Sequence, residues 1–145
     1  MAVSGNDGDT NIAIGLAALG TGDVAGAGNI GIGASALTAL TSGTNNIGVG
    51  LTSGDALTTG TDNVAIGRLA FSASTDGADN IAIGRSALAV SGNDGDTNIA
   101  IGLAALGTGD VAGAGNIGIG ASALAAVTSG TNNIGVGLTS GDALT

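Results

Sequence analysis

The chain has 145 residues, of which 30 are Gly, 43% are hydrophobic and 9% are charged, and its formal net charge is −9. It contains no Pro, Cys, His, Trp, Tyr, Lys, Glu or Gln, so the side chains that most enzymes use for acid–base and covalent catalysis are missing. A disulfide framework and a thiol or His metal site are excluded, and we expect neither catalysis nor a cofactor.

Charge and hydropathy also restrict the partners. Arg68 and Arg85 are the two basic residues against eleven Asp, so the basic surface that binds nucleic acid is absent. Gly, Ser, Thr and Asn interrupt every apolar stretch before it reaches the roughly 18 residues of a membrane helix. We therefore expect no nucleic-acid partner and no membrane span.

A long internal repeat dominates the chain. Residues 2–58 recur as residues 89–145 with two changes, Thr38 to Ala125 and Leu40 to Val127. The sequence thus consists of an 87-residue super-repeat (2–88) and a partial second copy (89–145). We interpret residues 1–145 as a single repetitive segment.

A shorter repeat lies within the long one. A five-residue string of Asn, Ile or Val, Ala or Gly, Ile or Val, and Gly recurs eight times at steps of 17 or 18 residues. Its β-branched residues are two positions apart, which is typical of one face of a strand and not of a helix. The residues between strings are rich in Gly, Ser, Thr, Asp and Asn, which favour turns. The pattern predicts an all-β fold, a parallel β-solenoid of about eight coils. In chain order the expected strands start at Asn11, Asn29, Asn46, Asn63, Asn80, Asn98, Asn116 and Asn133.

The two faces of these strands differ in size, and we expect the large residues to form the core. That predicted core consists of Ile12, Ile14, Ile30, Ile32, Ile47, Val49, Val64, Ile66, Ile81, Ile83, Ile99, Ile101, Ile117, Ile119, Ile134 and Val136.

A large apolar residue in the following turn should add to the core. It is Leu19, Leu37, Phe71, Leu88, Leu106 or Leu124, and we expect Leu57 and Leu144 to fill the same space where Gly54 and Gly141 replace it.

The small face is the predicted contact surface between chains. Burial of a few large side chains per coil does not offset the entropy of ordering 17 residues, so a second buried surface is expected. Tiny side chains permit another backbone to approach closely, which favours side-by-side chains. The expected close-packing face consists of Ala13, Gly31, Gly48, Ala65, Ala82, Ala100, Gly118 and Gly135.

The invariant Asn that starts each string has two interpretations. The eight side chains could form an amide ladder from coil to coil. Alternatively, Asn could be a turn residue that tolerates left-handed dihedral angles. Both roles are structural, and we favour the ladder.

Other motifs suggest ligands more weakly. The strings at 26–31 and 113–118 match the dinucleotide fingerprint GxGxxG but lack its strand-to-helix context. Thr is abundant, as the ranks of an ice-binding solenoid require, but no Thr column runs through all eight units. The densest group of hard oxygen ligands, the kind that calcium prefers, is Asp7 and Asp9 with Asn6, repeated as Asp94 and Asp96 with Asn93.

The two Arg residues occupy the same column in neighbouring coils. Stacked like charges repel each other. Either they form a receptor-contact patch or they pair with the nearby Asp62 and Asp79, and we favour the pairing.

Two stretches of the chain resemble a known group of repeats. The strings TGTDNVAIGRLAF (59–71) and GADNIAIGRSAL (77–88) are similar to head repeats of YadA-like trimeric autotransporter adhesins and to related repeats of bacteriophage tail fibres. The resemblance runs through nearly the whole chain. It implies parallel coils wound into a left-handed β-roll, three chains to a rod, and a surface fibre that contacts host molecules.

We therefore expect a structural and adhesive segment of a repetitive bacterial-surface or phage tail fibre. It would be extracellular or on a virion and would form an intertwined or side-by-side homotrimeric rod that is able to grow end to end. It would act as a rigid spacer and as a rod that contacts a host-surface receptor. Three alternatives stay open: a calcium-stabilised β-roll, an ice-binding single-chain solenoid and a subunit of a self-assembling extracellular filament.

Overall fold

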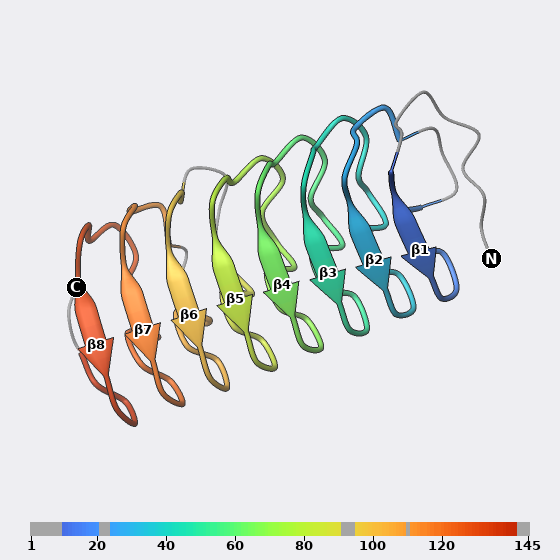
Figure 1. The fold of residues 1–145 in the computed structure, drawn as a ribbon. Helices are drawn as coiled ribbons and strands as arrows, with labels where there is room; N and C mark the ends of the chain where they lie inside the picture. The colour runs from blue at the N-terminus through green and yellow to red at the C-terminus, as the bar shows by residue number, and fades with distance from the viewer. Residues whose placement is uncertain (1–9, 21–23, 91–94, 110, 142–145) are drawn as a thin grey trace.

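The computed structural model of the chain describes residues 10–20, 24–90, 95–109 and 111–141. Within these ranges the fold is an all-β parallel solenoid of about seven turns without helix (Figure 1). Eight three-residue strands form one sheet in sequence order. They are β1 (Ile12–Ile14), β2 (Ile30–Ile32), β3 (Ile47–Val49), β4 (Val64–Ile66), β5 (Ile81–Ile83), β6 (Ile99–Ile101), β7 (Ile117–Ile119) and β8 (Ile134–Val136).

Each strand pairs in parallel with the next one, and the register pairs equivalent positions of the repeat. Between β5 and β6, for example, Ile81 pairs with Ile99 and Ala82 with Ala100. The same register holds where the repeat step is 18 residues, so the extra residue is absorbed outside the strands. The strands consequently lie side by side like rungs along the rod (Figure 1).

The turn after each strand depends on left-handed backbone. Gly33 has a φ of 132°, and a Cβ built there would lie 2.5 Å from the carbonyl oxygen of Gly50, so the position requires Gly. Ser35 and Leu37 follow with φ of 56° and 53°, which strains a residue with a Cβ. Hydrogen bonds to both neighbouring coils offset that strain, because the Ser35 N–H donates to Leu16 and the Leu37 N–H donates to Ser53.

The prediction of which strand face is inward was wrong. Ala82 and Ala100 are fully buried, whereas Ile66 and Ile119, in coils with neighbours on both sides, are each 38% exposed. None of the sixteen predicted core residues is buried. The correction applies to Ile12, Ile14, Ile30, Ile32, Ile47, Val49, Val64, Ile66, Ile81, Ile83, Ile99, Ile101, Ile117, Ile119, Ile134 and Val136.

The predicted close-packing face lies inside the coils and is not a surface between chains. Its residues are buried, apart from the half-buried first one. They are Ala13, Gly31, Gly48, Ala65, Ala82, Ala100, Gly118 and Gly135.

The width of the coil explains this inversion. A Cβ built at Gly48 would lie 2.7 Å from Cγ of Leu37, which reaches across from the opposite wall. The interior is therefore one large side chain deep, and two facing layers of large residues would overlap there. The Leu and Phe residues of the turn fill this space, while the strand contributes Ala or Gly. The buried turn residues are Leu19, Leu37, Phe71, Leu88, Leu106 and Leu124.

Two coils fill the interior in their own ways. Leu57 is buried, as predicted, but it is equivalent to Leu40 and not to Leu37. The backbone N–H of Leu40 donates to the carbonyl of Leu37, and that of Leu57 donates in the same way to the carbonyl of Gly54. In the coil of β4 the smaller Ser74 stands at that place, and the ring of Phe71 reaches toward it. Leu144, the other predicted filler, lies outside the described residues.

Candidate interaction face

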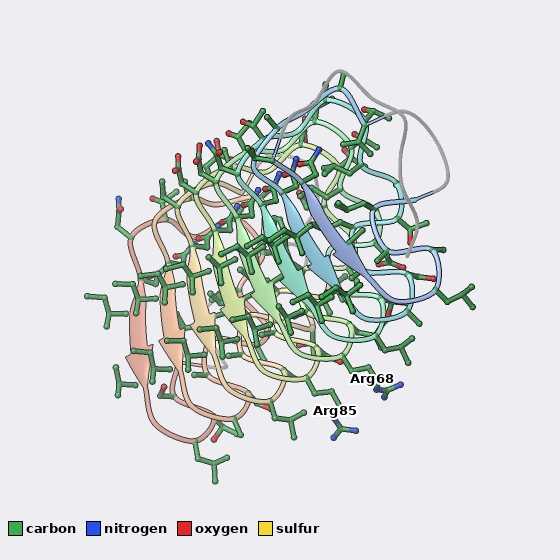
Figure 2. The ribbon with its side chains drawn as sticks, turned by 45° about the vertical axis from the view of Figure 1, so that its right-hand side comes forward. Arg68 and Arg85 are labelled. Atoms are coloured by element: carbon green, nitrogen blue, oxygen red, sulfur yellow. The ribbon has the colours of Figure 1, made fainter. Side chains whose placement is uncertain are left out.

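The outward side chains of the strands form an aliphatic strip along the rod. We define the aliphatic strip as the two Ile or Val residues of each strand from β1 to β8. Neighbouring coils cover the side chains of β2 to β7 from both sides, yet about a third of the side chain stays in solvent at several of these positions, as for Ile66, Ile101 and Ile119. Figure 2 shows these carbon side chains projecting from the sheet. A continuous apolar surface of this kind is typical of an interaction site.

The edge that follows the strands widens the apolar surface in most coils. There Leu51 is 48% exposed and Leu103 is 45% exposed in coils that have neighbours on both sides, and Arg occupies the position in two coils. This following edge consists of Leu16, Ala34, Leu51, Arg68, Arg85, Leu103, Ala121 and Leu138.

The edge that precedes the strands is polar or Gly. Each of its residues has a positive φ, between 58° and 75° in the cases of Asp62, Asn45 and Thr10. The left-handed position is thus the residue before the invariant Asn, and not the Asn itself. This preceding edge consists of Thr10, Gly28, Asn45, Asp62, Asp79, Thr97, Gly115 and Asn132.

The predicted Asn ladder runs directly behind the strip. In the central coils Asn63 is buried, its Nδ2 donates to Oδ1 of Asn46 at 2.9 Å and to the Gly77 carbonyl at 2.6 Å, and its Oδ1 accepts the Asn80 backbone N–H at 3.0 Å. Buried amides with satisfied hydrogen bonds fix the register of adjacent coils. The ladder comprises Asn11, Asn29, Asn46, Asn63, Asn80, Asn98, Asn116 and Asn133.

One rung of the ladder is incomplete. The backbone N–H of Asn98 donates to Oδ1 of Asn80 at 2.9 Å, and Oδ1 of Asn98 accepts from Asn116. Its Nδ2, however, is buried without a hydrogen-bond partner among the described residues. This rung should contribute less stability than the others.

The predicted pairing of Arg68 with Asp62 and of Arg85 with Asp79 was wrong within the chain. Both Arg side chains are exposed and form no ion pair with any described residue. Figure 2 shows both guanidinium groups pointing away from the rod. Asp62 instead accepts a hydrogen bond from Nδ2 of Asn45 at 3.1 Å. Acid and base lie on opposite edges of the strip, with the strand between them.

The predicted calcium ligands fall mostly outside the described residues. Asp7, Asp9 and Asp94 belong to that part of the chain, whereas Asp96 accepts the backbone N–H of Ala78 at 2.7 Å. No group of three acids able to hold a metal occurs in the ranges that the structure describes.

The dinucleotide-like Gly string serves the solenoid turn. Gly28 has a φ of 75° ahead of β2, Gly31 lies inside the strand, and no helix follows within the next described residues.

Among the acids that the structure describes, Asp55 has the most perturbed environment. Its Oδ1 is buried and lacks a hydrogen-bond partner among the described residues. Burial raises the pKa of the Asp55 carboxyl above its ordinary value of 3.8, and a hydrogen bond from its own backbone N–H opposes this.

Sequence reasoning missed the outward strip, although one signal was available. The residue between the two β-branched positions is Ala or Gly in all eight strands. A column restricted to the smallest residues is typical of a thin, close-packed interior as well as of an interface between chains.

Comparisons with known proteins add no family. The chain matches no protein-family model, and no curated protein or solved structure is similar enough to count as a match. Within the described ranges, no helix is long and apolar enough to span a bilayer.

Proposed function

We propose that the chain is a structural and adhesive segment of a repetitive fibre on a bacterial surface or a phage tail. Three copies associate along the aliphatic strip into one rod, which serves as a rigid spacer and presents its outer surface to a host receptor. The assignment requires no catalysis and no cofactor. The single observation that carries it is the uninterrupted aliphatic strip on a regular stack of coils.

The exposure of the strip supplies a driving force for association. Burying a whole Ile side chain contributes about 1.5 to 3 kcal/mol, so the third that stays exposed is worth about 0.5 to 1 kcal/mol. Summed over the strip, this is on the order of 10 kcal/mol per chain, within the range of the entropic cost of association. Covering this surface with another copy removes apolar area from water, and this gain acts against the mutual repulsion of chains of net charge −9.

The regular stack supports the mechanical role. Each strand takes both neighbours in the same register, so additional coils lengthen the rod by about 4.8 Å each without changing its cross-section. The backbone edges of β1 and β8 carry no further strand in the described structure. End-to-end growth into a filament is a second mode of assembly in this proposal, because every coil can pair with a further coil in the same register.

Sedimentation of the wild type and of two matched variants tests the proposal. Ile66→Asp adds one negative charge to the strip, and Ala73→Asp adds the same charge at an exposed residue outside it. We expect the wild type and Ala73→Asp to sediment at about three times the 13.2 kDa of one chain. Ile66→Asp should sediment as a folded monomer.

A monomeric wild type at every concentration would overturn the trimeric fibre. It would return attention to the single-chain alternatives, the calcium-stabilised roll and the ice-binding solenoid. The first of these predicts unfolding by a chelator, and the second predicts thermal hysteresis.

A further inference from the structure

Two neighbouring coils carry opposite charges on the two edges of the aliphatic strip. In the coil of β4, the exposed Asp62 precedes the strand and the exposed Arg68 follows it. In the coil of β5, Asp79 and Arg85 take the same positions. Across the strip, each of these coils therefore runs from acid through two aliphatic residues to base.

The other six coils have no charge at either position. Their preceding edge carries Thr, Gly or Asn, and their following edge carries Leu or Ala. The acids and the bases thus occur together, at the same level of the rod. If the preceding edge of one chain contacts the following edge of another at the same level, acid and base must occur in the same coils, as they do here.

The charges on each edge are not neutralised by a charge of opposite sign on the same edge. The coils of β4 and β5 are adjacent, about 4.8 Å apart, so Arg68 stacks on Arg85 and Asp62 stacks on Asp79. An extended strand of this length separates the two edges by roughly 15 to 20 Å, too far for a pair within one coil. The described residues give neither Arg an ion pair. Both edges are therefore free to pair with charges of opposite sign on another chain.

We propose that the occupant of this site is a second copy of the chain, aligned parallel and in register. Arg68 and Arg85 of one copy then pair with the Asp62 and Asp79 edge of the next copy. This inference rests on the proposed association along the strip, and it adds the direction and the register of the chains.

Symmetry decides between parallel and antiparallel packing. If the rotation axis runs along the rod, the Arg edge of each copy meets the Asp edge of its neighbour at the same level. This holds in a ring of three as it does in a pair. If one copy is turned end over end, Arg faces Arg and Asp faces Asp. Because both pairs are at the solvent-exposed rim of the strip, they select orientation and register more than they add affinity.

Charge reversal on each edge tests the inference. In Arg68→Asp with Arg85→Asp, both edges become acidic, so we expect the dissociation constant of the assembly to rise about tenfold or more. The reverse variant, Asp62→Arg with Asp79→Arg, should be weakened as well, although its net charge is closer to zero. Combining all four changes in one chain, which keeps the wild-type net charge, should restore assembly fully. Mixing the two variants should restore it only in part, because a ring of three then keeps one contact between edges of like charge. The readout is mass by sedimentation velocity, with circular dichroism to verify the fold.

A second measurement uses the absence of Cys from the chain. Asp62→Cys and Arg68→Cys copies are mixed, allowed to assemble and treated with a short bismaleimide linker. Parallel packing predicts a product that joins one copy of each kind. Products that join two identical copies would overturn the inference.

The two proposals fail in different ways. A monomeric wild type would contradict association along the strip and the charge pairing with it. A wild-type oligomer whose mass is unaffected by both edge reversals would contradict the charge pairing alone. Loss of assembly in the fourfold variant, with its fold intact, would also overturn the pairing.

Discussion

The two faces of one strand differ in burial and in the size of their side chains. On the inner face of β4, Asn63 and Ala65 are buried and tightly contacted, whereas on the outer face Val64 is half-buried and Ile66 is exposed. The larger residues are thus outside. The difference teaches that in a coil one large side chain deep, the strand contributes small residues to the interior because the turn supplies the large ones, and the β-branched residues of the strand face outward.

The sharpest way to break this comparison is to place the same charge on each face in turn. Ala65→Asp puts a carboxylate in the closed interior, and we expect a loss of about 3 to 5 kcal/mol in the free energy of unfolding. Ile66→Asp, one residue later, should keep the β-type circular dichroism spectrum of a folded chain. Equal destabilisation in denaturant titrations would contradict the assignment of the faces.

Large-to-small changes in Leu residues compare the faces without charge. Leu106 is fully buried, so Leu106→Ala should cost about 2 to 5 kcal/mol in the free energy of unfolding. Leu103→Ala, on the exposed following edge, should change the unfolding of the single chain by less than about 1 kcal/mol. The pair is compared by chemical denaturation at one protein concentration, and a larger loss for Leu103→Ala would refute the burial pattern.

The ladder offers a smaller contrast between two Asn residues. Asn63→Ala removes two bonds donated by Nδ2 and leaves the buried N–H of Asn80 without its acceptor, which should cost about 2 to 3 kcal/mol. Asn98→Ala should cost about 1 kcal/mol less, because Nδ2 of Asn98 has no partner to lose among the described residues. Thermal melts of both variants measure the difference, which vanishes if the two rungs are equivalent.

The smallest expected effect concerns Asp55 and pH. Its raised pKa means that the folded state binds the proton more tightly than the unfolded state, so this residue lowers stability as pH rises from 3.8 through the raised pKa. Asp55→Asn should therefore melt at a slightly higher temperature than the wild type at pH 7. At a pH below 3.8 the advantage should disappear. A lower melting temperature for the variant at pH 7 would contradict the burial of the carboxyl.

The strands were predictable because the repeat shows their positions directly. Residues spaced two apart, as Ile81 and Ile83 are, identify a strand and its two faces. The Asn ladder followed from the same regularity. The inward face was not predictable in this way, because alternation is identical whichever side is buried. What decides it is the reach of Leu37 and its equivalents from the opposite wall, which depends on the left-handed turn.

The charged edges were visible in the sequence but were assigned to the wrong partner. Asp62 and Arg68 are close along the chain, which suggested a pair within it. The strand between them holds them apart, and that separation depends on the fold. Local spacing in sequence therefore gave the right residues and the wrong contact.

The mass of the wild-type chain in solution tests the central claim most directly, that the aliphatic strip is an interface between copies. Sedimentation velocity with interference optics suits a protein without Trp or Tyr. The account predicts an elongated species of about three times 13.2 kDa that becomes monomeric in Ile66→Asp and not in Ala73→Asp. A folded wild-type monomer with its strip in water at every concentration would contradict it.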